Sequence, residues 1–264
     1  WLAANLIEFT ADVYDTVVFA TDNQPVKLPG YRVDALTDAA IRYIDAHQDA
    51  PFFLFISYLE PHHQNHVDDY PPPDGYREPY TGKWVPPDLQ ALGGSSAQQL
   101  GGYFGMAKRL DEALGRMRDA LKSLGMADNT VILFTSDHGN HFKTRNPEYK
   151  RSCHEASVRV PTAFCGPGFD GRGRVNQQVS LLDLPPTLLD AAGIDIPETM
   201  EGRSILPLLN GGDPDWPEEA FIQISESQIG RALRTKRWKY SVSAPGKSGW
   251  EEPASDEYVE EYLY

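Results

Sequence analysis

Two short apolar runs, each followed directly by a cluster of polar side chains, limit most strongly what this chain can fold into. The run VILF at 131–134 leads into Ser136, Asp137, His138 and Gly139, and the run PFFLFISYL at 51–59 leads into a histidine-rich stretch. Continuous apolar runs of this length are typical of strands buried on both faces in a parallel sheet. The carboxyl ends of parallel strands meet at one edge, where open α/β sheets bind ligands. The sequence therefore predicts an α/β fold with a functional site at that edge.

Helical periodicity predicts the elements that cover such a sheet. Apolar residues recur at intervals of three and four over 31–47 and over 97–124, and Gly125 is a suitable residue to end the second helix. A third helix is expected near 183–192, with Asp183 as its candidate cap. From about Ala220 the pattern changes to alternation around a Lys-Arg turn, which predicts antiparallel strands. We expect two domains, a catalytic α/β part over 1–219 and a smaller antiparallel part over 220–264.

Composition excludes several classes of function. The formal net charge is -14 and the isoelectric point is near 4.9, which argues against a nucleic-acid partner. The sequence has no apolar run long enough to cross a membrane, so no membrane partner is expected. Two cysteines cannot build a disulfide framework. Cys153 lies beside His154, but adjacent residues seldom bring their functional atoms together, which disfavours a thiol nucleophile.

The loop after the apolar run at 131–134, residues 137–154, combines a possible metal site with many cations. Asp137 and His138 could both ligate a metal if the chain has left strand geometry, which Gly139 favours, although a turn with a helix cap is the ordinary alternative. Four fixed positive charges and two further histidines follow: Lys143, Arg145, Lys150, Arg151, His141 and His154. In an acidic protein this concentration favours an anion pocket, whereas a solvated basic face is the simpler interpretation.

The order of residues in this loop resembles a known enzyme family. The matching positions are Asp137, His138, Gly139, Lys150, Glu155, Arg159, Val160 and Pro161. They resemble the carboxyl-terminal half of a sulfatase of the alkaline phosphatase superfamily. The resemblance implies an α/β fold of the alkaline-phosphatase-like sandwich type, with a mostly parallel central sheet flanked by helices and a smaller carboxyl-terminal antiparallel α+β unit. The stretch 141–157 is more similar to members that act on sulfated polysaccharides than to those that cleave small aryl esters.

The resemblance also implies roles for individual residues. Asp137 and His138 would ligate calcium, Lys150 would contact the sulfate, and His62 would protonate the leaving oxygen, which suits an imidazole with a pKa near 6.5. A sulfated carbohydrate is then the expected partner. The residues expected to bind it are His63, Gln64, His141, Lys143, Arg145, Arg151 and His154. Relatives are often exported, so a periplasmic or secreted location in a bacterium is expected.

One part of the family pattern is missing from these residues. The nucleophile of the family is a formylglycine made from Cys or Ser in a Cys/Ser-x-Pro-x-Arg motif, and no such motif occurs here. The nearest sequences begin at Cys165 and Ser243, and both lack the arginine. We therefore expect the nucleophile and the rest of the calcium shell to come from a missing amino-terminal segment or a partner chain. On its own, this chain is expected to show no turnover.

Two other functions fit the same residues. A phosphatase or phosphodiesterase on the same fold would also place Asp and His after a strand, and a histidine ligand favours zinc over calcium. A second alternative is a non-catalytic remnant that binds sulfated glycans through Lys150 and Arg151. Metal content separates the first alternative from a sulfatase, and turnover separates the second.

Overall fold

The computed structural model describes residues 1–4, 12–171, 173–212 and 215–264. The chain forms two compact units, Trp1–Asp128 and Asn129–Tyr264, and each is described here by itself. The predicted division at 219/220 concerns the domains of the protein and stays a prediction. In the described residues, no helix is both long and apolar enough to cross a membrane.

The first unit contains a small antiparallel sheet in the order β1-β2-β3, formed by Leu2–Ala3, Thr16–Ala20 and Pro25–Leu28. Its strands β2 and β3 pair with Val18 opposite Val26. Asn23, at a φ of 61°, forms the connecting turn, a conformation that asparagine tolerates better than most residues. Residues 1–23 mix apolar and acidic side chains without a clean period, so the local sequence pattern does not predict this sheet.

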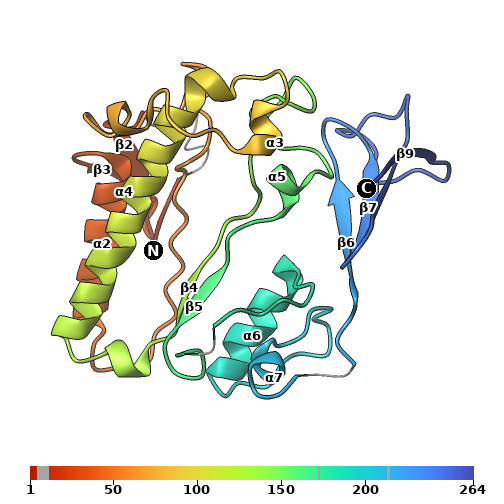
Figure 1. The fold of residues 1–264 in the computed structure, drawn as a ribbon. Helices are drawn as coiled ribbons and strands as arrows, with labels where there is room; N and C mark the ends of the chain where they lie inside the picture. The colour runs from red at the N-terminus through yellow and green to blue at the C-terminus, as the bar shows by residue number, and fades with distance from the viewer. Residues whose placement is uncertain (5–11, 172, 213–214) are drawn as a thin grey trace. The chain divides into compact units, whose positions relative to one another are not determined.

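Two helices are the longest elements described in the first unit. Helix α2 (Arg32–Ala46) and helix α4 (Ser96–Ser123) run side by side, as Figure 1 shows, and both were predicted. Their apolar stripes meet in a buried cluster that includes Tyr31, Val33 and Ala113. Gly125, at a φ of 71°, follows α4 as expected. The short elements η1 (Glu78–Tyr80) and α3 (Pro87–Gln90) also belong to this unit, and η2 (Ala127–Asn129) spans the boundary between the two units.

The apolar run at 51–59 differs from its prediction. It is expected to be a buried strand, but no strand is assigned to it within the described residues. Its side chains alternate between half-buried and exposed, and Phe53 and Phe55 are 74% and 78% exposed. Alternation with period two is the geometry of an extended chain. This segment therefore has the pattern of a strand without the pairing of one.

The second unit begins with a two-stranded sheet that positions the loop of interest. Strand β4 (Ile132–Phe134) pairs with β5 (Ala163–Cys165), with Leu133 opposite Phe164. The strand at 131–134 was predicted, but the parallel pairing and full burial expected for it are wrong for this pair. The two strands are antiparallel, and all three residues of β4 are half-buried. Helix α5 (Glu155–Val158) lies between them in sequence.

A small helical cluster packs beside β4 and β5. It contains η3 (Leu181–Asp183), α6 (Leu184–Ala191) and α7 (Leu206–Leu209). Phe169, Ile205 and Trp216 are its buried centre, against which Val131 and Phe164 pack. The N-cap of η3 is Ser180, whose side chain accepts a hydrogen bond from the backbone N–H of Leu182. Asp183 is the N-cap residue of α6, as predicted, but its side chain makes no cap hydrogen bond to α6 and instead completes the capping box of η3 with Ser180.

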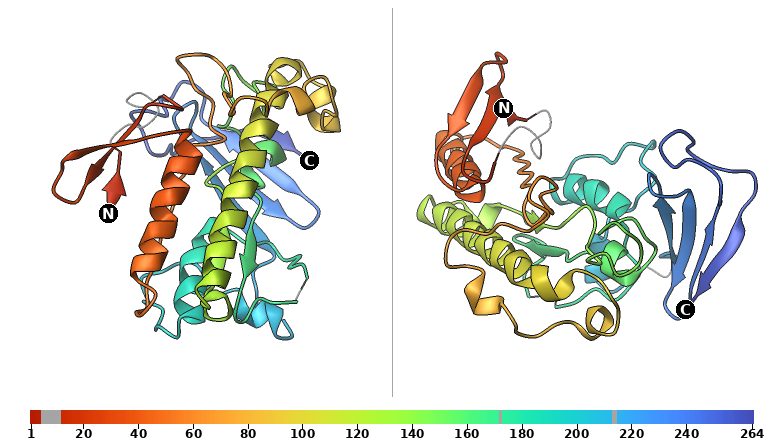
Figure 2. Two further views of the ribbon diagram at one scale, coloured as in Figure 1. Left: turned by 90° about the vertical axis from the view of Figure 1, so that its left-hand side faces the viewer. Right: turned by 90° about the horizontal axis from the view of Figure 1, so that it is seen from above.

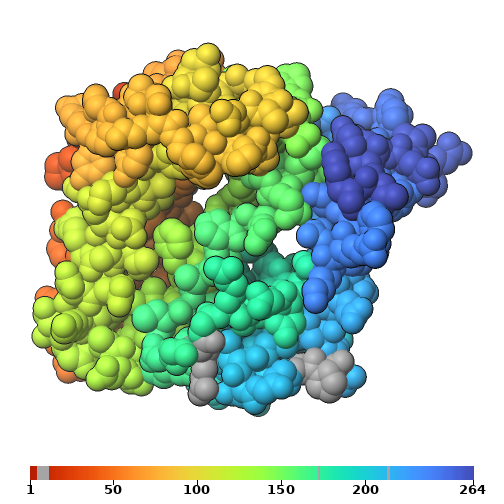
Figure 3. Space-filling model, in the orientation of Figure 1, coloured from red at the N-terminus to blue at the C-terminus, as the bar shows by residue number. Residues whose placement is uncertain are grey.

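The chain ends in a four-stranded antiparallel sheet in the order β6-β7-β8-β9, visible in Figures 1 and 2. Its strands are Glu219–Ile224, Gly230–Thr235, Lys239–Ser243 and Val259–Leu263. The antiparallel pairing and the turn between β7 and β8 agree with the prediction from alternation. Strand β9, drawn in deep blue at the surface in Figure 3, was not predicted and forms the edge next to β8.

Candidate functional site

The turn after the carboxyl-terminal end of β4 presents a carboxylate and an imidazole to solvent. The Asp137 side chain is 83% exposed, and its Oδ2 lies 3.5 Å from Nε2 of His138. The other carboxylate oxygen of Asp137 accepts a hydrogen bond of 2.9 Å from the backbone N–H of His138. Ser136 Oγ donates to the carbonyl of His138 at 2.8 Å, so the turn is held by its own hydrogen bonds. Both predicted metal ligands therefore leave the strand on the same side of the turn.

Gly139 fixes this turn against helix α5. Its N–H donates to the carbonyl of Ser157 at 2.7 Å. A Cβ at position 139 would lie only 2.1 Å from the carbonyl oxygen of Ala156, so no other residue fits without a shift of backbone. The need for glycine here is close approach, not an unusual φ. Because α5 begins five residues after Lys150, this contact joins the two halves of the family motif.

The connection between them, residues 140–149, is a compact loop with a strained centre. Phe142 and Lys143 have φ values of 50° and 58°, a left-handed conformation that bulky residues rarely adopt. The strain is held in place by burial of Phe142, which is 2% exposed, and by a hydrogen bond of 2.8 Å from its N–H to Asn140 Oδ1. Consecutive strained residues are concentrated at functional sites, where surrounding structure maintains them. This loop is consistent with such a site.

His141 lies at the base of the loop and is fully buried. The backbone N–H of His141 donates to the carbonyl of Tyr149 at 2.7 Å, and the backbone carbonyl of His141 accepts a hydrogen bond from Thr144. Neither ring nitrogen of His141 has a hydrogen-bond partner among the residues that the structure describes. Burial lowers the pKa of His141 to about 4, and the charge of Arg145 adds to this effect. At neutral pH this imidazole is therefore uncharged, and in this structure it is closed to substrate.

Arg151 fastens the segment from Lys150 to Glu155 to the connection between β6 and β7, the first turn of the carboxyl-terminal sheet. Its guanidinium pairs with Glu148 at 2.8 Å and with Glu226, which follows β6. Its carbonyl accepts hydrogen bonds from Asn146 at 2.8 Å and from Ser227 at 3.4 Å. Arg151 was predicted to bind substrate. In the structure, its charge is already shared by two carboxylates.

The next residues continue the attachment to the sheet. Cys153 is 1% exposed and packs against Ile224 and Ala232, so it is a core residue. His154 is 6% exposed, and its Nε2 lies 2.7 Å from the hydroxyl of Tyr264. Burial, with smaller contributions from nearby cations, lowers the pKa of His154 to about 4. This histidine is therefore a neutral link to the end of the chain.

Glu155, the last residue of the segment, is bound by two cations. Its Oε1 lies 3.2 Å from Nε of Arg234 and 3.3 Å from Nζ of Lys239, which come from β7 and β8. Burial opposes the charge of Glu155, but the two cations outweigh burial and hold the pKa of Glu155 below its usual range. The side chain of Lys239 is only 6% exposed. The cation that holds Glu155 is therefore largely removed from water.

His62 lies in the first unit, in a segment with its own supports. Its Nδ1 lies 2.6 Å from the carbonyl of His63. His63 is 3% exposed, with Nδ1 3.0 Å from Asn65 and Nε2 3.0 Å from Asp68. Gln64 is fully buried, and its amide donates to the carbonyl of His62 at 3.2 Å. His63 and Gln64 shape the segment that presents His62.

The structure brings together some of the predicted residues. The turn at Asp137 and His138 is tied to the helix that follows Lys150. Lys143 and Arg145 lie in the strained loop between them, Lys143 half-buried and Arg145 exposed. Sequence reasoning missed the groups that support this loop, namely Glu226, Arg234, Lys239 and Tyr264. They lie 75 or more positions beyond the residues they bind, and only three-dimensional pairing shows them.

The donors at the end of β4 fit calcium only in part. A carboxylate oxygen such as that of Asp137 is an ordinary calcium ligand, but calcium takes about six to eight oxygen ligands, and imidazole nitrogen suits zinc better. Among the described residues, no three side chains of His, Cys, Asp or Glu gather as a metal site. Asp137 and His138 therefore supply at most part of a metal shell.

Comparison with known proteins assigns the chain to a family. Residues 7–194 match the Sulfatase family model, and residues 148–245 match the model of the N-sulphoglucosamine sulphohydrolase carboxyl-terminal part. An ulvan-active sulfatase of Formosa agariphila is 29% identical over 277 residues, which cover 97% of this chain and 53% of that protein. Arylsulfatase K of the dog is 35% identical over 156 residues, covering 55% of this chain and 29% of that protein.

A solved structure supports the same assignment. The crystal structure of yidJ from Bacteroides fragilis matches with a TM-score of 0.75 at 26% identity, over 88% of this chain and 54% of that one. The chain belongs to the sulfatase family, whose members hydrolyse sulfuric esters. The predicted alkaline-phosphatase-like α/β fold is thereby confirmed. The chain spans about half the length of the ulvan-active relative and of yidJ.

Proposed function

We propose that this chain is the carboxyl-terminal part of an enzyme that hydrolyses sulfate esters on a sulfated polysaccharide. One observation carries the proposal: the contact of Gly139 with Ala156 and Ser157 joins the Asp137–His138 turn to the helix that follows Lys150. A carboxylate for a metal and a lysine for an anion are thus held in one compact unit. The name of the ulvan-active relative supports a polysaccharide rather than a small aryl ester as substrate.

The proposed roles follow from the chemistry of each side chain. Lys150 counters the negative charge of the sulfate, a contribution that increases as charge moves onto the leaving oxygen. His62 donates a proton to that oxygen, so it must be protonated when the bond breaks. Calcium, when bound by Asp137, His138 and ligands from elsewhere, would polarise the sulfate. The formylglycine nucleophile would come from the amino-terminal half of the enzyme, and export to the periplasm or beyond would bring the enzyme to its substrate.

The test of the proposal uses the complete enzyme, with the segment that carries the nucleophile. Release of sulfate from ulvan oligosaccharides is measured for the parent, for Lys150→Ala and for Lys236→Ala, a matched control in the turn after β7. We expect Lys150→Ala to lower kcat/KM by about 100-fold or more, as loss of a charge-stabilising group does, with the control within twofold. Faster cleavage of aryl phosphate than aryl sulfate, with stoichiometric zinc, would overturn the sulfatase assignment in favour of a phosphatase.

A second experiment separates metal binding from folding. We expect Asp137→Ala to abolish calcium binding in the complete enzyme while leaving a cooperative thermal transition in excess chelator, because an 83% exposed side chain anchors little core. A variant that fails to fold where the metal-free parent folds would show a structural role for Asp137.

The 264-residue chain alone provides a third test. It should release no sulfate from any ester, because it lacks the nucleophile motif. Sulfate release that Lys150→Ala suppresses would locate a nucleophile inside this chain. Glycan binding without turnover in the complete enzyme would instead support the non-catalytic alternative.

A further inference from the structure

Trp250 is an exposed aromatic residue on a loop that is fixed close to the proposed site. Its side chain is 75% exposed, among the highest fractions for large apolar residues here. The guanidinium carbon of Arg151, the residue after Lys150, lies 5.8 Å from the centre of the indole ring. Arg151 can therefore support one part of the ring, while most of its surface faces water.

The backbone beside Trp250 is held by a second contact with the same region. Gly249 pairs with Glu226 in an isolated antiparallel bridge, and Glu226 also pairs with Arg151. A Cβ on residue 249 would lie 2.7 Å from the carbonyl oxygen of Glu226, so this approach requires glycine. A single exposed apolar side chain is ordinary by itself, so what distinguishes Trp250 is the fastened loop that carries it beside Arg151.

A small pocket lies at the same loop. Its volume is about 230 Å³, and its lining consists of Ser227, Gln228, Ser243, Ala244, Pro245, Gly246 and Lys247. Ser227 adjoins Glu226 and donates a hydrogen bond to the carbonyl of Arg151 at 3.4 Å. Lys247 is paired with Glu252 at 2.6 Å. The pocket therefore adjoins the Lys150 segment and presents hydroxyl and amide groups more than free charge.

The combination of an exposed indole with a polar pocket fits a sugar ring. The C–H face of a pyranose packs on an aromatic ring, and its hydroxyls need polar partners such as serine and glutamine side chains. Pockets for drug-sized ligands are about 300–1,000 Å³. A volume near 230 Å³ suits one ring, not an oligosaccharide.

We propose that Trp250 and this pocket form an additional subsite for an uncleaved pyranose of the polysaccharide whose sulfate faces Lys150. The proposal rests on the proposed function. The subsite would bind the glycan through a neighbouring ring, so it would favour a chain of sugars over an isolated sulfated ring. Part of the binding of the polymer then comes from a residue that does not touch the sulfate.

Trp238 provides a matched control. It is also exposed, at 49%, and carries an arginine, Arg237, 4.9 Å from its ring centre. It lies in the turn between β7 and β8, and its turn is closed by hydrogen bonds with Thr235. Loss of Trp238 removes a similar exposed indole on the same unit, from a turn that has no described contact with Arg151 or Glu226.

The experiment measures binding of an ulvan tetrasaccharide to the 264-residue chain. The chain has five tryptophans, so Trp250→Phe identifies the indole N–H signal of Trp250 in a nuclear magnetic resonance spectrum. We expect that signal to shift with the tetrasaccharide. We expect the dissociation constant to rise at least tenfold for Trp250→Ala and about threefold for Gln228→Ala. Trp238→Ala should stay within twofold, and circular dichroism verifies the fold of each variant.

The outcomes separate this subsite from the proposed function. Binding that depends on Lys150 and on sulfate, but not on Trp250, would overturn the subsite and leave the function standing. Binding that depends on Trp250 but is equal for a desulfated tetrasaccharide and for Lys150→Ala would support the subsite and contradict the sulfate site. Absence of any binding by the folded chain would overturn the subsite.

Discussion

The segment that presents His62 is attached through a fully buried ion pair, whereas each ion pair that attaches the segment presenting Lys150 has at least one partly exposed side chain. Glu60, two residues before His62, pairs with Arg32 of α2 at 2.9 Å, and neither side chain is exposed. In the second segment, the side chains of Arg151 and Glu155 are 24% and 45% exposed. The same kind of contact therefore works in two different dielectric environments.

This difference in burial determines how much stability each segment loses when one partner of an ion pair is removed. A buried charge that loses its partner has no water to replace it, and the cost is large. An exposed charge that loses its partner is solvated again, so the cost is small. Burial also raises the pKa of Glu60, even though the charge of Arg32 opposes that rise. The first segment thus contains a buried ion pair whose disruption is costly, and the second is attached through contacts that are each less costly to lose.

The largest expected effect is the loss of Arg32. Arg32→Met leaves Glu60 buried without its cation, and the free energy of unfolding should fall by about 3–5 kcal/mol. The measurement is urea unfolding of the chain at pH 7. The double variant Arg32→Met/Glu60→Leu is the control, because two apolar side chains need no charge partner, and it should recover most of the loss. A double variant as unstable as the single one would show that the pair acts by shape and not by charge.

Acid should weaken the second segment through its neutral histidines. Burial lowers the pKa of His141 and of His154 to about 4, while an unfolded histidine titrates near 6.5. The folded state therefore keeps its full stability above pH 6.5 and loses stability as pH falls from there toward 4. At pH 5 the expected loss is at most about 2 kcal/mol for each histidine.

The control for this pH effect removes one titrating group. His141→Phe should reduce the stability lost between pH 7 and pH 5 by about 2 kcal/mol, whatever it does to stability at pH 7. The measurement is urea unfolding at both pH values, compared with the parent. An unchanged difference between the two pH values would mean that His141 is open to protons in the folded chain.

The sequence predicted the elements of both segments better than their supports. Helices α2 and α4 follow from apolar residues at intervals of three and four, and β6 to β8 follow from alternation. The polar turn after β4 was located because a short apolar run ends there. These features depend on residues close in sequence, so local pattern is enough to find them.

The supports could not be predicted because they join distant residues. Nothing in the sequence around His154 indicates a hydrogen bond with Tyr264, 110 positions away. The partner of β4 is β5 in an antiparallel pair, although a short apolar run is equally compatible with a parallel sheet. The burial of Arg32 was likewise hidden, since an arginine at the start of a helix is usually exposed. Pairing and burial are properties of the folded chain.

A smaller effect is expected at Glu155. Glu155→Gln keeps the shape of the side chain but removes the charge that holds Arg234 and Lys239. Because the pair with Arg234 is open to water, the expected loss is about 1 kcal/mol at pH 7, most of it from Lys239. The folded pKa of Glu155 is lowered, so its contribution is complete above the unfolded pKa and disappears as pH falls through the folded pKa.

Two further measurements check the Glu155 prediction. The difference in unfolding free energy between Glu155→Gln and the parent should shrink in acid, where the parent carboxylate is protonated as well. Arg234→Ala, which removes only the more exposed of the two cations, should cost less than Glu155→Gln. Equal losses for the two variants would show that the buried Lys239 does not need a carboxylate, and would remove burial as the explanation.

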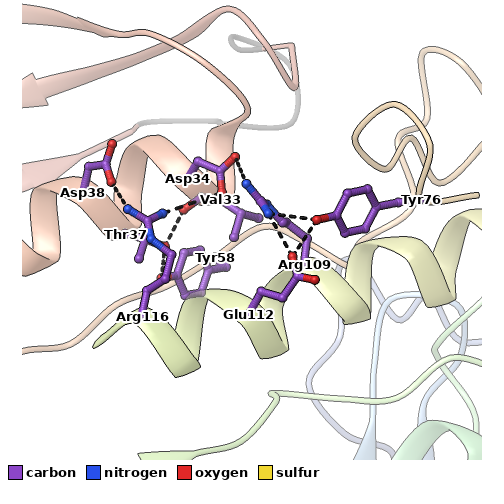
Figure 4. A network of polar contacts seen from close by, with 9 residues as sticks. All are labelled: Val33, Asp34, Thr37, Asp38, Tyr58, Tyr76, Arg109, Glu112 and Arg116. Atoms are coloured by element: carbon purple, nitrogen blue, oxygen red, sulfur yellow. Dashed lines mark hydrogen bonds and ion pairs between the residues drawn. The ribbon is translucent and has the colours of Figure 1, made fainter. Parts of the chain in front are cut away.

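The smallest effect is expected at Arg116, which Figure 4 shows in the polar network between α2 and α4. Arg116 pairs with Asp38 and lies 3.9 Å from Asp34, and it is 42% exposed. Asp34 retains a second partner, Arg109, at 2.7 Å. Arg116→Ala should therefore cost less than about 1 kcal/mol, and less still in 0.5 M salt, which screens exposed charges. Arg32 and Arg116 both form ion pairs that involve a residue of α2. The ratio of the two losses in unfolding free energy therefore tests whether burial decides the strength of an ion pair. A loss at Arg116 as large as that of Arg32→Met would mean that the number of ion pairs, and not their burial, sets the stability of this unit.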